Sequence, residues 1–256
     1  MIQNEPVSPF RASVALGIVS LLVEAVVFFL DMKEETLLRI LHLAEMVVLI
    51  GIAFFYQLHA ARSLSMDADH RRKWMRVSFW IRSGLVFSLA GDFINSKLFD
   101  FTFILKPQTL LSILPFAAAH IYYIRSFIFV SNDTEATAKK RLIATMLVWP
   151  LIAFPLWYFL MGRTAQGIML YLSLPYALLV TLMALFSIHV SSSRGSLAFP
   201  VTAGGFLFLL SDSLIAYSLV NEPSALRSQA IWITYILAQI LITGTMRLAF
   251  ERAVPN

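Results

Sequence analysis

Long apolar runs alternate with short polar segments along the whole chain. An α-helix of about twenty apolar residues spans the ~30 Å hydrocarbon core of a bilayer, and eight runs of roughly this length occur in the sequence. Because the hydrocarbon core contains no water, a single segment there can form all of its backbone hydrogen bonds only as a helix. The pattern therefore predicts an all-α membrane protein with eight transmembrane helices, at Ala12–Leu30, Leu37–Phe55, Val77–Ile94, Thr109–Phe129, Leu142–Leu160, Ile168–Val190, Leu197–Val220 and Ala230–Phe250.

The composition agrees with a membrane protein. Hydrophobic residues make up 59% of the chain and charged residues only 14%, whereas soluble domains average about 45–50% and 25%. No polar segment is long enough to form a separate domain, so we expect a single polytopic domain over residues 1–256. The chain contains no cysteine, which excludes disulfide bonds and thiolate chemistry.

The basic residues predict the orientation in the membrane. Eight spans place both termini on one side, and that side holds thirteen lysines and arginines against six on the other. Cytoplasmic loops carry the excess of positive charge, so we expect an integral protein of the cell membrane (the inner membrane of a bacterium) with cytoplasmic termini. The basic residues lie in loops and form no stripe interleaved with aromatics, so no nucleic-acid partner is predicted.

Several polar side chains fall within the predicted spans. An ionisable group at the centre of a bilayer costs about 2.5–3.5 kcal/mol on insertion scales, so such groups are candidates for function, although pairing inside a bundle is a common structural use. The residues concerned are Glu24, His42, Glu45, Arg82, Asp92, His120, Asp212 and Gln239.

Two of these residues, Asp92 and Asp212, have matching surroundings. Each lies about sixteen residues into a predicted outward-running helix, and His120 and Gln239 follow them by 28 and 27 residues respectively. This spacing suggests a decayed duplication, with halves at about 12–130 and 142–250 related by an axis along the membrane normal. Such an arrangement would bring both aspartates into one polar site at similar depth.

Other polar residues share helical faces with these groups. Ser88 and Asn95 lie on the face of Asp92, Ser211 precedes Asp212, and Tyr123 is three residues after His120. Tyr235 and Gln239 form a second pair at a spacing of four. These residues are predicted to line or support the site. His42 and Glu45 have the spacing of a buried structural pair, and Glu24 and Arg82 are open to pairing with each other or with lipid headgroups.

Known catalytic motifs restrict the alternatives. The sequence lacks a His-Glu-x-x-His metal site, a Gly-x-Ser-x-Gly nucleophile turn and a glycine-rich phosphate loop, so no metal is predicted. Intramembrane aspartyl proteases use Gly-x-Gly-Asp, and Leu89-Ala90-Gly91-Asp92 lacks the first glycine. A protease is therefore disfavoured.

The sequence resembles the YhhN family of lysoplasmalogenases over roughly Val77 to Thr243. The resemblance depends on Gly91-Asp92, Ala119-His120 with Tyr123, Leu210-Ser211-Asp212 through Ala216, and Tyr235 with Ala238-Gln239-Ile240-Leu241-Ile242. The Lys-Pro pair that opens the second helix in many members is replaced here by Leu38-Arg39-Ile40-Leu41-His42. The resemblance implies an eight-helix hydrolase that cleaves the vinyl ether of a lysophospholipid (lysoplasmalogen), a reaction whose chemistry requires no metal or organic cofactor. Its products would be a fatty aldehyde and glycerophosphoethanolamine or glycerophosphocholine.

The predicted site suits that reaction. Vinyl ether hydrolysis needs a proton donor and a carboxylate to stabilise a cation or activate water, and two carboxyl groups in one apolar site provide both. Asp92 and Asp212 are the predicted catalytic pair, and His120 is predicted to orient an aspartate or water.

A proton-coupled transporter that uses Asp92, His120 and Asp212 as a relay is the alternative function. It predicts a polar path to both sides of the membrane, whereas an enzyme needs one opening. The predicted polar residues gather in the outer half, which favours the enzyme. A lysolipid-binding or structural membrane protein is a third reading.

Overall fold

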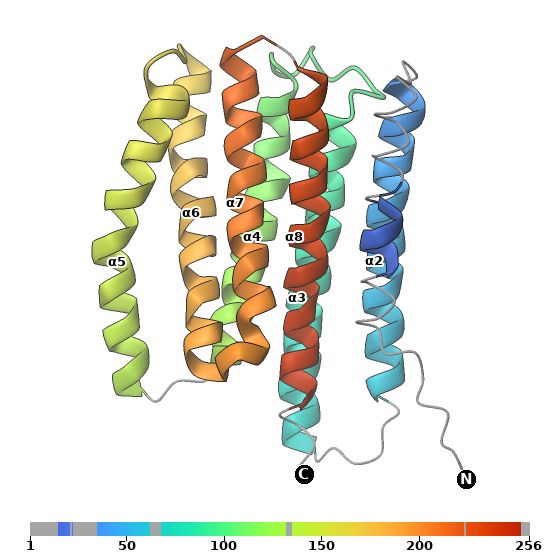
Figure 1. The fold of residues 1–256 in the computed structure, drawn as a ribbon, viewed down its shortest axis with the longest axis vertical. Coiled ribbons are helices and arrows are strands. Elements are labelled where there is room, and N and C mark those ends of the chain that lie inside the picture. Colours follow the sequence, from blue (N-terminus) through green and yellow to red (C-terminus); the bar gives the residue numbers. More distant parts are fainter. Residues whose placement is uncertain are drawn as a thin grey trace.

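The computed structural model describes residues 15–20, 22, 35–61, 68–131, 135–222 and 224–251, and these are helical apart from short connections, with no strand among them. Figure 1 shows a bundle of long helices that run up and down. The long helices are α2 (Glu35–Ala61), α3 (Ala68–Asn95), α4 (Thr109–Ser131), α5 (Glu135–Trp157), α6 (Ile168–Arg194), α7 (Phe199–Val220) and α8 (Ala225–Glu251), with a π-helical turn η1 (Tyr158–Gly162) and a 3-10 turn η2 (Gly195–Ala198).

The predicted spans from the second to the eighth are confirmed as helices. Six helical stretches are long and apolar enough to cross a membrane, and one of them, Ile168–Val220, contains both α6 and α7. The chain is thus a multipass membrane protein. Most of the first predicted span, Ala12–Leu30, lies outside the described residues; Ala15–Ser20 and Leu22 within it are helical. The count of eight and the two-fold relation of the halves therefore stay predictions.

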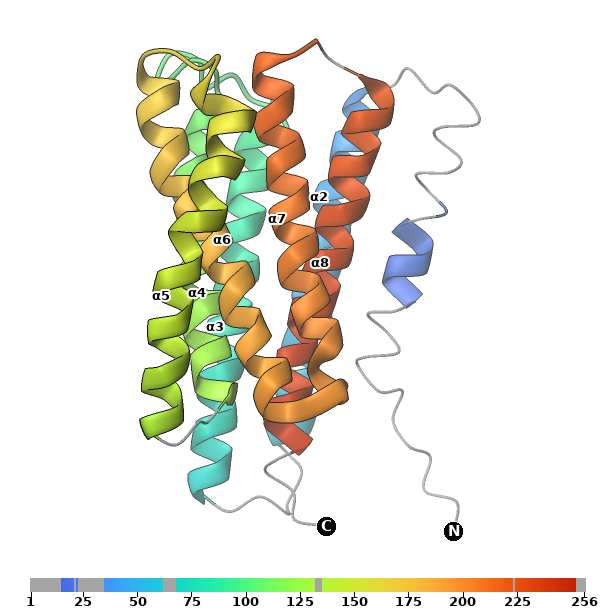
Figure 2. The same cartoon turned by 60° about the vertical axis from the view of Figure 1, so that its left-hand side comes forward.

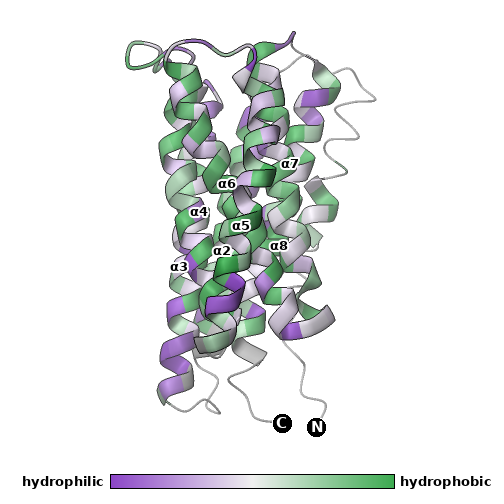
Figure 3. Cartoon of the chain, turned by 90° about the vertical axis from the view of Figure 1, so that its left-hand side faces the viewer, coloured by the Kyte–Doolittle hydropathy of each residue, from purple (hydrophilic) through white to green (hydrophobic). Residues whose placement is uncertain are grey.

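Several helices extend beyond the predicted apolar runs. The helix α3 begins at Ala68, nine residues before the predicted start at Val77, and its first turns carry polar and charged side chains. Figure 3 shows these hydrophilic residues at one end of an otherwise largely apolar bundle. A helix does not need to stop where hydrocarbon stops, because water and headgroups solvate the polar side chains of its outer turns.

Five helices form a closed ring. α3 packs on α4, α4 on α6, α6 on α7, α7 on α8, and α8 on α3. The helix α2 packs outside this ring against α3 and α8, and α5 packs outside it against α6. Figure 1 shows α2 and α5 at opposite edges of the bundle, and Figure 2 shows α2 behind α8. The interior of the five-helix ring is therefore the place where side chains from distant parts of the sequence meet.

The helices alternate in direction, which gives the bundle two different ends. At one end α3 and α7 finish and α4, α6 and α8 begin; we call it the mouth end. The C-terminal end of α8 lies at the opposite end (Figure 1).

Glycines on α3 let aromatic side chains of α4 lie against its backbone. A Cβ atom added at Gly84 would lie 2.2 Å from a ring carbon of Tyr123, and one added at Gly91 would lie 2.7 Å from the ring of Phe116. Neither distance is compatible with a methyl group, so these two glycines set the close approach of α3 and α4.

We expect Gly84→Ala to destabilise the protein, because the added methyl group must displace the buried Tyr123 ring. Overpacking of this kind costs about 1–3 kcal/mol. Gly51→Ala on α2 is the matched control, because nothing lies within 4 Å of its added Cβ and alanine favours a helix. Thermal unfolding in detergent should show a lower midpoint for the Gly84 variant only. Equal midpoints for the two variants would contradict the packing role of Gly84.

Candidate active site

Two aspartates from different helices face the interior of the five-helix ring, each held by a tyrosine. The Tyr235 hydroxyl of α8 donates a 2.6 Å hydrogen bond to Asp92 Oδ2 of α3. The Tyr176 hydroxyl of α6 donates a 2.7 Å hydrogen bond to Asp212 Oδ2 of α7. The Phe208 ring of α7 lies next to both groups, 5.4 Å from the Tyr235 ring and 4.7 Å from the ring of His120 on α4, measured between centroids. Four helices thus fix two acidic groups in one region.

His120 of α4 joins the group around Asp212. Its Nε2 lies 3.2 Å from the Tyr176 hydroxyl oxygen and 3.5 Å from Asp212 Oδ2. Because Tyr176 donates its proton to Asp212, its oxygen is free to accept an Nε2–H from the histidine, which assigns the tautomer. The ring is fully buried and stands edge-on to Phe208, with 4.7 Å between ring centroids. His120 is therefore placed to orient Tyr176 and Asp212 together.

A second hydrogen-bonded chain lies deeper in the ring. The Tyr123 hydroxyl donates a 2.7 Å hydrogen bond to Gln239 Oε1 and lies 3.4 Å from Ser88 Oγ. All three side chains are fully buried. Gln239 is one helical turn from Tyr235 on α8, so this chain continues along the helix face that supports Asp92. The structure brings together the predicted residues Ser88, Tyr123, Tyr235 and Gln239.

The other two predicted residues, Asn95 and Ser211, form hydrogen bonds with groups other than the carboxylates. Asn95 accepts a 2.9 Å hydrogen bond from the Thr109 hydroxyl at the mouth end. The Ser211 hydroxyl donates to the Ile231 carbonyl at 3.0 Å. It therefore ties α7 to α8 and points away from the carboxylate of its neighbour Asp212.

Tyr176 was not identified from the sequence. It lies in an apolar run, Leu174-Pro175-Tyr176-Ala177, and carries no charge at neutral pH. The feature that could have pointed to a role for Tyr176 is its hydroxyl, because the hydroxyl of a buried tyrosine usually has a hydrogen-bond partner. Its partners are on α4 and α7, so only the packing of three helices reveals its position.

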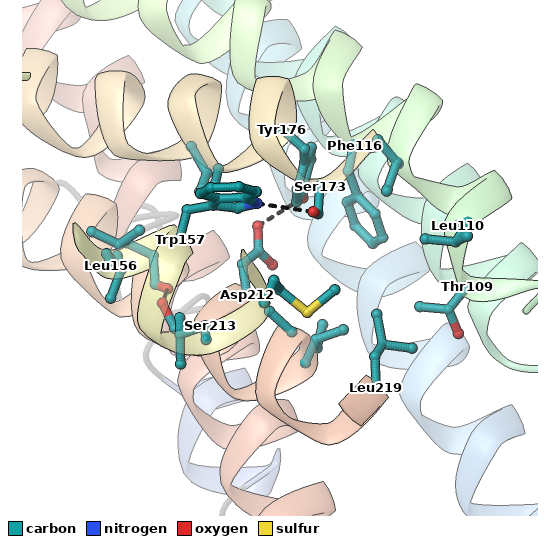
Figure 4. Close-up of a pocket in the computed structure, with 18 of the residues that line it drawn as sticks. Thr109, Leu110, Phe116, Leu156, Trp157, Ser173, Tyr176, Asp212, Ser213 and Leu219 are labelled. Atoms are coloured by element: carbon teal, nitrogen blue, oxygen red, sulfur yellow. Dashed lines mark hydrogen bonds between the residues drawn. The ribbon is translucent and has the colours of Figure 1, made fainter. Parts of the chain in front are cut away.

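A pocket of about 740 Å³, including its opening, lies beside Asp212. Figure 4 shows Asp212 in the middle of the pocket, with Tyr176 and Trp157 on one side and Phe116 and Leu110 on the other. The Trp157 indole nitrogen donates a 3.0 Å hydrogen bond to Ser173 Oγ. Further lining residues are mostly apolar: Ile113, Leu156, Leu160, Met161, Ala177, Val180, Leu209, Ile215, Ala216 and Leu219.

The π-helical turn η1 shapes one wall of this pocket. It follows α5 directly, and its residues Leu160 and Met161 line the pocket together with Trp157. A Cβ atom at Gly162 would lie 2.9 Å from the Trp157 ring, so the glycine leaves room for the indole. π-Helical turns are rare and are frequent at functional sites.

The other polar residues of the predicted spans lie on the outer side of the ring. The Trp232 indole donates a 2.8 Å hydrogen bond to Glu45 Oε2 and stacks on His42, with 4.0 Å between ring centroids. Arg82 lies over the Phe54 ring, 4.3 Å from its centroid, and donates to the Ser78 carbonyl. Glu24 lies outside the described residues. Within the part of the chain that the structure describes, no three His, Asp or Glu side chains come together as metal ligands.

Comparison with known proteins identifies a family but no individual relative. The sequence profile of the YhhN family matches residues 42–246, a region that runs from α2 into α8 and contains all the residues of the cluster described above. No protein of curated function and no solved structure matches the chain. Because the match covers most of the chain, this protein belongs to the YhhN family, a multipass membrane family.

Proposed function

We propose that this protein is a lysoplasmalogenase-like hydrolase that cleaves the vinyl ether of a single-chain phospholipid. The observation that carries the proposal is a pair of carboxylates, each hydrogen-bonded by a tyrosine, in an apolar ring with an open pocket beside Asp212. Membership of the YhhN family supports the same activity, because that family is associated with lysoplasmalogenase function.

The pocket suits a lipid with one hydrocarbon chain. Most of its lining is aliphatic or aromatic, which is typical of pockets that bind apolar ligands. Aliphatic side chains from α6, α7 and η1 provide the surface for the chain. Asn95, Thr109 and Ser112 lie near the mouth end of the pocket and supply polar groups for the glycerol and phosphate. With cytoplasmic termini, as the charge bias predicts, this mouth faces the outer leaflet.

In the proposed reaction, a carboxyl group transfers its proton to the β-carbon of the vinyl ether. The double bond becomes a CH₂ group next to an oxocarbenium ion, R–CH₂–CH=O⁺–R′. Water adds to the cationic carbon and gives up one proton to the carboxylates, which leaves a hemiacetal. Breaking its C–O bond to the glycerol releases the aldehyde R–CH₂–CHO and the alcohol R′–OH. The aspartate pair supplies one proton donor and one acceptor, as in glycoside hydrolysis through a similar cation.

Aromatic rings around Asp212 are placed to stabilise the cation. Trp157 and Phe116 lie on opposite sides of the aspartate (Figure 4), and Ser173 holds the indole in position. The face of an aromatic ring attracts a cation most strongly where water is excluded. The carboxylate that remains ionised would add its own charge to this stabilisation.

The packing below the site weighs against a transporter. The large side chains between the cluster and the opposite end are apolar and buried: Val77, Ile81, Phe127, Val130, Val190, Ile242 and Met246. The fully buried polar side chains of this stretch are small hydroxyls, which do not titrate: Ser78, Ser126, Ser187 and Thr245. A proton relay across the membrane would need titratable groups or water along this stretch. A site with one opening is what a hydrolase requires.

The proposal is tested with two substrates in deuterated buffer. Purified protein is incubated with lysoplasmalogen and with its saturated alkyl-ether analogue, and released aldehyde is measured by mass spectrometry. We expect aldehyde from the vinyl ether only, because an alkyl ether has no carbon that can accept the proton, and one deuterium at the aldehyde α-carbon. The absence of aldehyde would overturn the activity, whereas aldehyde without that deuterium would overturn only the mechanism.

A further inference from the structure

The connection between α3 and α4 exposes large apolar side chains at the mouth end of the bundle. This segment, Ser96–Gln108, is called the phenylalanine loop below. Phe103 is 80% exposed, and Phe99 and Ile104 are each 57% exposed. Such exposure is ordinary on the lipid-facing side of a spanning helix, but these residues lie beyond the helix ends, where a polar loop would normally face water.

The phenylalanine loop is held in a defined shape by one buried glutamine. Gln108 is 4% exposed; its amide nitrogen donates to the Ile94 carbonyl at 2.6 Å and the Phe99 carbonyl at 2.9 Å. Its amide oxygen accepts the Phe101 N–H at 3.0 Å. Gln108 thus fixes the backbone on both sides of the exposed rings.

Contacts between the aromatic rings, and a turn at Asp100, further stabilise the shape of the loop. The Phe93 and Phe99 rings lie 5.2 Å apart and the Phe101 and Phe103 rings 6.5 Å apart, measured between centroids. The Asp100 carboxylate accepts the Thr102 N–H at 2.8 Å. The exposed apolar surface is therefore presented by a folded loop.

The exposed rings do not fill the catalytic pocket. The pocket is lined by Asn95 and Thr109, which flank the loop, and Ser96–Gln108 contributes none of the described lining residues. The apolar side chains are therefore turned to the surroundings of the protein.

Charged residues alternate with the apolar ones. Lys97 and Lys106 bracket the exposed rings, and both are exposed. The hydrogen bond from Thr102 lowers the pKa of the Asp100 carboxyl, which therefore carries a charge at neutral pH. Aromatic residues are enriched where acyl chains meet headgroups, and lysine side chains there extend toward phosphate and water.

We propose that the phenylalanine loop lies in the boundary between headgroups and acyl chains of the membrane. Phe99, Phe103 and Ile104 contact the acyl chains, while Lys97 and Lys106 contact lipid phosphates. The loop is joined directly to two residues at the mouth of the pocket, so it holds that mouth at the depth of the lipid glycerol groups. This role is independent of the reaction that the site catalyses.

The chain has no cysteine, so an introduced single cysteine can be spin-labelled without first replacing native cysteines. The full-length protein carrying Phe103→Cys is reconstituted in phosphatidylcholine vesicles, and the collision rates of the nitroxide with oxygen and with a water-soluble nickel chelate are measured. Leu151→Cys on α5, 74% exposed, is the deep reference, and Thr164→Cys in the connection between η1 and α6 is the aqueous reference. Each variant is first checked for an unchanged gel-filtration profile and melting temperature.

We expect the label at position 103 to favour oxygen over the nickel chelate, at a depth between those of the two references. Accessibility equal to that of Thr164→Cys would overturn the proposal. Protection from both reagents together with dipolar broadening between labels would also overturn it, because that result means contact with a second copy of the chain.

A second variant tests the cause of the insertion. With the label at Phe99→Cys, the added substitution Phe103→Asp should move the nitroxide toward water and raise its nickel collision rate several-fold. Thr164→Asp added to the same labelled protein is the control and should leave the rate unchanged. An unchanged depth in the Phe103→Asp variant would show that the exposed ring does not anchor the loop, and would overturn the proposal.

Discussion

Asparagine in place of Asp92 or of Asp212 is expected to abolish turnover of a vinyl ether lysolipid while the protein remains folded. Asparagine has nearly the same shape, and its oxygen still accepts the hydrogen bond that Tyr235 or Tyr176 donates. It cannot take up or release the proton. General acid–base catalysis contributes about 10²–10⁴-fold for each group, so we expect kcat to fall by at least about 1,000-fold in either variant.

Asp100→Asn is the matched control for this experiment. Asp100 is an exposed aspartate in the phenylalanine loop and does not line the pocket, so its replacement should leave kcat unchanged. Aldehyde release is measured for all three variants together with their gel-filtration profiles. Near-normal kcat in a folded Asp92→Asn or Asp212→Asn protein would remove that residue from the proposed catalytic pair.

Phenylalanine in place of Tyr176 is expected to lower kcat by about 10- to 100-fold. The Tyr176 hydroxyl connects His120 to Asp212, so its loss releases both groups from their shared geometry while the ring still fills its space. Because the effect is on the reacting groups, kcat should change more than KM. Tyr171→Phe is the control, because Tyr171 lies on the same helix with 76% exposure.

A double variant separates positioning from simple loss of stability. His120→Ala alone should reduce kcat by about 10- to 1,000-fold. If His120 acts through Tyr176, adding Tyr176→Phe should cost little more, because residues of one hydrogen-bonded network are not additive. Fully additive losses would show that the two side chains act separately and would contradict the connection seen in the structure.

Part of a membrane site of this kind can be predicted from the sequence, because burying a polar group in lipid costs free energy. A titratable side chain inside an apolar run is energetically costly whichever residues it contacts. This cost identifies Asp92, Asp212 and His120 from the sequence. Tyr123, Tyr235 and Gln239 followed from helical spacing around the same positions. Tyr176 did not, because an uncharged aromatic residue carries no comparable penalty and its partners lie on two other helices.

Helical spacing alone also does not predict which partner a side chain contacts. Ser211 adjoins Asp212 in the chain, yet its hydroxyl bonds to the α8 backbone, because successive residues of a helix point about 100° apart. Asn95 shares a helical face with Asp92, but it is fixed by Thr109 at the mouth end. Helical periodicity predicts a face, whereas the neighbouring helix determines the partner.

The sequence by itself determined that this chain is a helical membrane protein, where most of its helices lie and which acidic groups they bury. The reason is that lipid requires continuous backbone hydrogen bonding and makes every buried charge costly in free energy. Only the tertiary structure decided that five helices close into a ring, that each aspartate takes a tyrosine from another helix, and that an apolar pocket opens beside Asp212. These features depend on contacts between residues far apart in the chain, such as Gly84 with Tyr123 and Asp92 with Tyr235. Close packing of side chains selects such contacts, and hydropathy along the sequence contains no information about them.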